Sequence, residues 1–186
     1  MTRETEPHVL LDEAGVEETL GQLADGIISG GPSDDLVLVG IRRRGVELAE
    51  RLAALVGERL GRTVSTGSLD ITLYRDDFAQ IGSMPLIGTT EIPVDVTDRR
   101  VVIVDDVLYT GRTIRAALNE IADFGRPSRI ELCVLVDRGG RELPIQADYV
   151  GLSQVVADGE HVEVRVPEQD DELCVRVVSA DQTGLE

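Results

Sequence analysis

The chain contains no lysine and no tryptophan, and aromatic residues make up only 3% of its 186 residues. All 18 basic side chains are arginines, against 35 Asp and Glu, so the formal net charge is −17. A protein this acidic repels nucleic-acid backbones at long range, which disfavours binding through overall charge. Two interpretations of the composition remain open: a GC-rich genome that encodes Arg in place of Lys, and adaptation to a salty cytoplasm, where acidic surfaces aid solubility.

Long apolar runs and dense cysteine are also absent. No apolar run approaches the ~20 residues that cross a bilayer, so we expect no membrane-spanning segment. The segment Met1 to Pro7 lacks the basic and apolar regions of a signal peptide. Cys133 and Cys174 lie in apolar strand patterns without metal-ligand spacing, which indicates reduced core residues and a cytoplasmic protein. The length and the 42% apolar content predict a single domain with a substantial core.

The most informative stretch runs from Val101 to Thr113. Four β-branched apolar residues open it, which predicts a strand buried on both faces. Two carboxylates, Asp105 and Asp106, follow, and then a short loop. An amphipathic helix begins after the loop, with one apolar face formed by Ile114, Ala117, Leu118, Ile121 and Phe124. The carboxylates therefore stand at the carboxyl end of a buried strand, where open α/β sheets bind ligands.

The residue types in this loop suggest a ribose 5-phosphate. Gly111 lets the backbone fold closely around an anion, and the free N–H groups of a helix start attract phosphate. Two ionised carboxylates would repel that phosphate, so they fit sugar hydroxyls or a hydrated Mg²⁺ beside it. The alternative is a solvated strand end followed by an ordinary helix cap. A bare Asp-Asp pair would favour that alternative, but the whole run favours the ligand.

This run resembles the phosphoribosyl-pyrophosphate (PRPP) binding motif of type I phosphoribosyltransferases: an apolar strand, two acids, three residues, and then Thr-Gly-x-Thr. The resemblance implies an α/β fold. We therefore expect a central, mainly parallel sheet flanked by helices, with a flexible β-arm and a small hood.

The rest of the chain predicts alternating helices and strands. Residues 10–28 have helical periodicity, with Asp12 as the cap and Gly30-Gly31-Pro32 at the end. A buried strand at 36–40 precedes a second helix, whose apolar face contains Ala49, Leu52, Ala53, Val56 and Leu60. Further on, the pattern indicates a buried strand at 129–137, a short edge strand at 148–151, and antiparallel strands in a tail that alternates from Val162 to Val177.

Between these parts, residues 64–74 have a strand-like pattern and residues 76–91 have none. Such a stretch is typical of a mobile functional segment, and we interpret it as an arm that closes over the site. The alternative is a hairpin that serves only packing or dimer contacts. Residues 92–96 are the expected return strand, with a proline at an edge position.

Arginines follow the first buried strand, at Arg42, Arg43 and Arg44. A basic run is usually a solvated face. Here it interrupts an acidic chain at the sheet edge where the phosphate loop is expected. The planar fork of arginine suits pyrophosphate, so we favour binding by Arg43 and Arg44. Arg75 would add a cation from the arm.

Several further blocks are similar to the PyrR family of bifunctional pyrimidine operon attenuators and uracil phosphoribosyltransferases. The similarity covers roughly residues 10–178 and is dense from Leu69 to Gly151. It implies that uracil and PRPP give UMP and pyrophosphate, with Mg²⁺. The whole of 1–186 would then form one phosphoribosyltransferase domain, with its arm at about 75–92 and its hood at about 137–180.

The PyrR resemblance also implies roles for single residues. Asp105 and Asp106 would bind the ribose hydroxyls, directly or through Mg²⁺. The 5-phosphate loop would consist of Val107, Leu108, Tyr109, Thr110, Gly111, Arg112 and Thr113. Arg43 and Arg44 would line the pyrophosphate loop, Arg75 would arrive with the arm, and Arg138 and Val162 would belong to the hood over uracil. Tyr109 stands where purine-type relatives carry an acid, so no general base is obvious.

The family's second role is UMP-dependent binding of operon leader RNA on a basic concave face of a homodimer or dimer of dimers. The matching positions here carry no base: they are Gly21, Gln22, Asp25, Gly30, Gln146, Leu152 and Asp158. An RNA surface needs cations that face phosphates. The leading hypothesis is therefore an enzyme. The alternatives are an RNA-binding attenuator that senses UMP with little catalysis, and a relative that has lost both activities.

Overall fold

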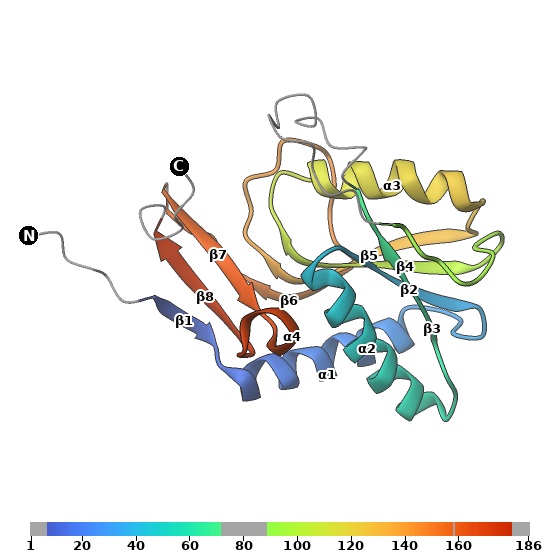
Figure 1. Ribbon diagram of the computed structural model, residues 1–186, viewed down its shortest axis with the longest axis horizontal. Coiled ribbons are helices and arrows are strands. Elements are labelled where there is room, and N and C mark those ends of the chain that lie inside the picture. Colours follow the sequence, from blue (N-terminus) through green and yellow to red (C-terminus); the bar gives the residue numbers. More distant parts are fainter. Residues whose placement is uncertain (1–6, 72–88, 158, 180–186) are drawn as a thin grey trace, which may run out of the picture.

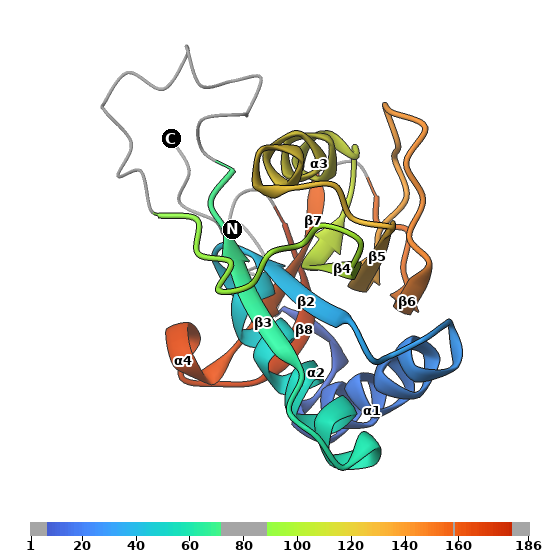
Figure 2. The ribbon, with the colours of Figure 1, turned by 90° about the vertical axis from the view of Figure 1, so that its right-hand side faces the viewer.

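The computed structural model describes residues 7–71, 89–157 and 159–179. Its larger sheet has five parallel strands in the order β3-β2-β4-β5-β6. The strands are β2 (Leu36–Ile41), β3 (Ser65–Leu69), β4 (Arg100–Leu108), β5 (Arg129–Asp137) and β6 (Tyr149–Ser153). Helices α1 (Glu13–Ser29) and α2 (Arg44–Leu60) cover one face, and α3 (Arg112–Phe124) covers the other (Figures 1 and 2). The arrangement confirms the predicted parallel α/β fold.

The central strands are apolar on both sides because both sheet faces are covered. Every residue of β2 is buried, and so are the first six residues of β4. One core cluster lies between the sheet and the α1–α2 layer, and a second lies under α3. This burial holds the carboxyl ends of β2 and β4 side by side, with Gly40 paired to Val104.

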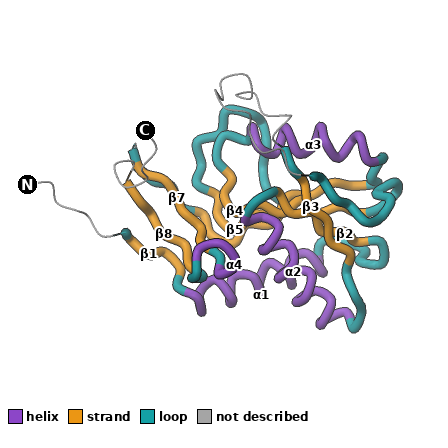
Figure 3. The backbone as a smooth tube through the Cα atoms, viewed as in Figure 1, coloured by secondary structure: helices purple, strands orange, loops and turns teal. Residues whose placement is uncertain are grey.

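A smaller antiparallel sheet lies beside the main one, in the order β1-β8-β7 (Figure 3). Its strands are β1 (His8–Leu11), β7 (Glu160–Arg165) and β8 (Cys174–Ser179), and the short helix α4 (Pro167–Asp170) joins the last two in sequence. The alternation predicted for the tail is confirmed, since Val162 and Val164 are buried on one face of β7. The smaller sheet and α4 are called the hood below.

Three local predictions were wrong. Residues 10 and 11 belong to β1 rather than to the first helix, which begins after Asp12. The prediction that Asp12 caps this helix is confirmed, because its side chain accepts a hydrogen bond from the Gly15 N–H at 2.9 Å. Residues 92–96 form no strand, and in the described part of this region only Glu91 makes a bridge, to Ser68. Leu118 and Phe124 are 37% and 41% exposed, because α3 buries its Ala116 side instead.

Other predictions are confirmed or lie outside the described residues. Strand β5 has the predicted bounds, and both Cys133 and Cys174 are buried free thiols. Residues 72–88, which include Arg75 and most of the predicted arm, are not among those described. Each helix in the described part of the chain is too short or too polar to cross a membrane.

Candidate active site

Asp105 and Asp106 lie near the carboxyl end of β4, as the sequence predicted. Asp105 is buried, with 6% exposure, and its Oδ1 accepts the Asp106 N–H at 3.0 Å. Asp106 is half-buried, and its Oδ1 accepts the Val107 N–H at 2.8 Å. The strand thus fixes two adjacent carboxylates in a place where little water solvates them.

Burial disfavours the state in which both carboxyl groups of this pair are ionised. Desolvation raises the pKa of Asp105 well above its usual range, and the neighbouring Asp106 charge raises it further. Burial also raises the pKa of Asp106, although the Val107 N–H and the positive charge of Arg44 oppose it. The pair therefore favours a cation, or hydroxyl groups that donate hydrogen bonds to it.

Glycine lets the first turn of α2 approach this strand closely. A Cβ on Gly45 would lie 2.6 Å from the Val104 carbonyl oxygen and 3.3 Å from Asp105 Cα. Any side chain at this position would push the helix start away from the acid pair. The three arginines of the β2–α2 turn are thereby held beside β4.

A cavity of about 1000 Å³ opens at this edge of the sheet. Five of the predicted site residues line it: Arg43, Asp105, Asp106, Val107 and Thr113. Among the described residues, six carboxylate side chains and only two arginines line the cavity. An anionic ligand would therefore need a further cation, such as a metal ion, to balance its charge.

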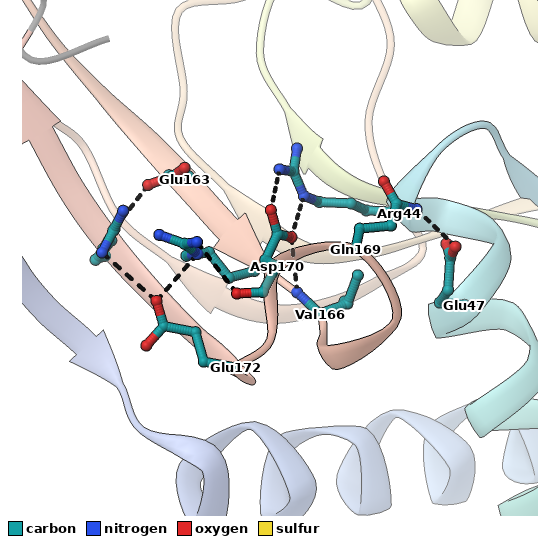
Figure 4. A network of polar contacts seen from close by, with 9 residues as sticks. Arg44, Glu47, Glu163, Val166, Gln169, Asp170 and Glu172 are labelled. Carbon is teal, nitrogen blue, oxygen red and sulfur yellow. Dashed lines mark hydrogen bonds and ion pairs between the residues drawn. The ribbon is translucent and has the colours of Figure 1, made fainter.

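The lining residues that were not predicted from the sequence include Glu47 of α2 and Gln169 of α4. The Gln169 Nε2 donates to Glu47 Oε1 at 2.6 Å (Figure 4). Glu47 has a spacing signal, since it lies one helical turn after the arginines. Gln169 has none, because only the tertiary fold brings the hood to α2.

The predicted phosphate loop has the backbone that such a loop requires. Gly111 has a φ of 91°, in the left-handed region that favours glycine, and α3 starts at the next residue. The Thr110 carbonyl accepts hydrogen bonds from the N–H groups of Glu142 and Leu143 at 3.0 and 3.1 Å. A pair between Arg112 Nε and Glu142 Oε2 at 2.7 Å also joins the two loops. The helix N-terminus can thus receive a phosphate next to Thr113.

The other predicted residues that the structure describes are not among those that line this cavity. The Arg138 guanidinium stacks 4.0 Å from the centroid of the Tyr109 ring and donates to the Glu160 carbonyl at 3.2 Å. Val162 is buried within β7, and Leu108 within β4. Arg44 faces the hood, where it pairs with Asp170.

The acid pair could supply two carboxylate ligands to a magnesium ion. In the described part of the chain, no group of three or more His, Cys, Asp or Glu side chains could hold a metal by itself. Mg²⁺ usually takes one or two protein carboxylates, water and the phosphates of its substrate. Asp105 and Asp106 could provide such carboxylates, and their raised pKa values would fall as the cation binds.

The chain matches the phosphoribosyl transferase domain family over residues 10–170. It is 53% identical over 170 residues to the bifunctional protein PyrR of Pelotomaculum thermopropionicum, covering 91% of this chain and 94% of that protein. It is 55% identical over 143 residues to the bifunctional protein PyrR of Chloroflexus aurantiacus, covering 76% and 79%.

Solved structures with a similar fold include purine phosphoribosyltransferases. A variant of the hypoxanthine phosphoribosyltransferase of Trypanosoma cruzi superposes with a TM-score of 0.72 at 20% identity, covering 97% of this chain and 98% of that one. The hypoxanthine-guanine phosphoribosyltransferase of Bacillus anthracis gives 0.70 at 19% identity, covering 91% and 97%. At this level of identity the likeness describes the fold alone.

Proposed function

The chain belongs to the phosphoribosyl transferase domain family and, within it, to the PyrR proteins, and on this basis we propose that it converts uracil and PRPP to UMP and pyrophosphate. One juxtaposition carries the proposal. One cavity is lined by the acid pair of β4, by Thr113 at the N-terminus of α3 and by Arg43. Gly111 of the predicted phosphate loop directly precedes α3. These groups match the sugar, the 5-phosphate and the pyrophosphate of one substrate.

The proposed roles of the site residues follow from the charges that develop on the sugar and on the pyrophosphate during the transfer. The bond between C1 of the ribose and the pyrophosphate oxygen breaks, a bond from C1 to uracil N1 forms, and the N1 proton leaves. The sugar gains positive charge as the first bond breaks, which the carboxylates of Asp105 and Asp106 favour. Mg²⁺ held by these carboxylates would neutralise charge on the departing pyrophosphate. Arg43 lines the same cavity and can bind the pyrophosphate oxygens.

The uracil ring is proposed to sit near the Tyr109–Arg138 stack. Both groups present flat π faces, and the guanidinium can also donate to a carbonyl oxygen of the base. The resemblance places Tyr109 where purine-type relatives carry an acid, so that position supplies no carboxylate to take the proton. Uracil would therefore lose its N1 proton to water, the substrate or the product pyrophosphate.

Replacing Asp106 tests the assignment. We expect Asp106→Asn to lower uracil-dependent release of pyrophosphate by roughly 100-fold or more, because charge at the forming cation is lost. Asp35→Asn is the matched control, since Asp35 is exposed in a turn before β2, at the opposite edge of the sheet. Near-normal turnover in Asp106→Asn would remove the acid pair from the mechanism.

The second part of the proposal concerns the regulatory role that the PyrR resemblance implies, and we propose that this chain performs that role only weakly. The exposed side of α1 carries Glu17 and Glu18, and the nearby Arg59 is paired with Asp25 at 3.1 Å. This arrangement disfavours phosphates on α1. We expect weak binding of pyrimidine operon leader RNA with and without UMP. Tight, UMP-stimulated and salt-sensitive binding in a titration would restore the attenuator as a full second function.

Assembly and location complete the proposal. The PyrR resemblance implies a homodimer or dimer of dimers, which analytical ultracentrifugation would test. Two free thiols fit the reducing conditions of the cytoplasm.

A further inference from the structure

The hood is tied to the pyrophosphate loop by the short helix α4. Three consecutive residues of α4 contact α2 in reverse order. Glu168 pairs with Arg51, and Figure 4 shows the contacts of Gln169 with Glu47 and of Asp170 with Arg44. The α2 residues are spaced three and four apart, so they lie on one face of that helix. The segment 168–170 therefore runs along the first two turns of α2.

The contact at the end nearest the site has the strongest geometry. Arg44 Nε donates to Asp170 Oδ2 at 3.0 Å, and Arg44 Nη2 donates to Asp170 Oδ1 at 2.9 Å. This is a two-pronged fork, and the Asp170 side chain is only 12% exposed. By contrast, the Arg51–Glu168 pair is a single contact with 31% and 47% exposure, so it constrains α2 much less.

Asp170 is itself held rigidly by the hood. Its Oδ2 also accepts the Val166 N–H at 3.0 Å, and its backbone carbonyl accepts a hydrogen bond from Arg165 at 3.1 Å. Arg165 pairs in turn with Glu172 at 3.0 Å, next to β8. The carboxylate thus cannot follow the arginine if the β2–α2 turn moves.

Arg44 also lies next to the residues of the turn that adjoin the acid pair. A Cβ on the neighbouring Gly45 would lie 3.3 Å from Asp105 Cα, and Arg43 lines one cavity together with Asp106. The hydrogen bonds from Arg44 lower the pKa of Asp170, so that carboxylate stays ionised at neutral pH. Arg44 therefore connects a carboxylate of the hood to the turn that adjoins the acid pair.

We propose that Asp170 is a positioning residue for the transfer reaction: its fork fixes Arg44 at the start of α2 and so sets the place of Arg43 and the pyrophosphate loop against Asp106. This inference rests on the proposed function. Arginine has many rotamers, and a group that must meet a pyrophosphate gains from being fixed before the substrate arrives. Asp170 does not touch the substrate and acts through Arg44.

The test uses the full chain and three variants. Asp170→Asn keeps the shape and one oxygen for Arg44 Nε and Val166, but it places an NH₂ group against Arg44 Nη2. Asp170→Glu restores the charge. Glu168→Gln is the control, because it changes the adjacent α4 contact without affecting the fork. The dissociation constant of Mg²⁺–PRPP is measured by calorimetry without uracil, and KM for each substrate, kcat and the melting temperature are measured alongside.

We expect Asp170→Asn to weaken PRPP binding and raise its KM by about ten- to a hundredfold, since small misplacements of binding groups cost this much. The KM for uracil should stay within the error of the wild type, as should both constants in Glu168→Gln. Asp170→Glu should recover most of the PRPP affinity.

Three results would overturn the inference: wild-type PRPP affinity in Asp170→Asn, an equal loss in Glu168→Gln, or an Asp170→Asn loss that only follows the unfolded fraction. Failure of the proposed function looks different, because the wild-type chain itself would then not bind Mg²⁺–PRPP. In that case the positioning role would fall with it.

Discussion

The buried acid pair should cost the protein stability at neutral pH, and Asp105→Asn should reveal that cost. Within the described residues, Asp105 forms no ion pair, and its close polar neighbours are the Asp106 N–H and the Asp106 carboxyl. An asparagine can still accept that N–H and can donate its NH₂ group to the Asp106 carboxylate. The variant therefore removes a poorly solvated charge while keeping the shape.

The pH dependence of this stability change follows from the difference between the pKa of Asp105 in the folded and in the unfolded chain. Burial and Asp106 raise the pKa of Asp105 above the unfolded value of about 3.9. Folding thus favours the protonated form, and this contribution is complete below the unfolded pKa and is lost as the pH rises through the raised one. Asp105→Asn should raise the free energy of unfolding at neutral pH by about 1–3 kcal/mol, the usual cost of an unsatisfied buried polar group. In a chain of this size that corresponds to a melting temperature roughly 3–9 °C higher.

The assay is thermal unfolding of wild type and Asp105→Asn over a pH series, with pyrophosphate release measured on the same samples. The gain in stability should shrink toward acid pH, and turnover should be lost at every pH. Glu131→Gln is the contrasting variant. Glu131 is equally buried but pairs with Arg100 at 2.5 Å and accepts from the Tyr149 hydroxyl at 2.8 Å. A lower melting temperature for Asp105→Asn than for the wild type at neutral pH would refute the reasoning.

The remaining predictions concern separate parts of the molecule. Glu131→Gln should destabilise the fold by about 3–5 kcal/mol in chemical unfolding, because Arg100 would be left buried and unpaired; a change under about 1 kcal/mol would contradict this. Gly111→Ala should raise the KM for PRPP, since a φ of 91° costs an alanine about 1–2 kcal/mol; an unchanged KM would argue against the loop. Burial raises the pKa of Cys133 to about 12, so iodoacetamide should label it only after unfolding, as mass spectrometry can check. If the acidic composition reflects halophily, activity and solubility should hold or rise as salt is raised, and a fall would favour genome bias.

The sequence by itself determined the parts that depend on neighbours in the chain. A run of β-branched residues followed by two acids defines the end of β4, whatever packs around it. The Thr110–Thr113 segment and the apolar spacing after it were sufficient to predict a glycine turn followed by α3. Asp12 could be recognised as a cap because its partner, Gly15, is only three residues away. The PyrR resemblance rested on further local blocks, which are dense from Leu69 to Gly151.

Only the tertiary structure decided which distant segments meet. Residues 8–11 carry too weak a local pattern to predict a strand, and they form one because β8 supplies hydrogen-bond partners from the other end of the chain. The exposure of Leu118 and Phe124 depends on how α3 is rotated on the sheet, which helical periodicity does not fix. The Arg44–Asp170 fork joins residues 126 positions apart, and an isolated Asp in an acidic tail gives no signal of its partner. Long-range pairing is set by the packing of all elements together, so the residues that position the site became visible only in the folded chain.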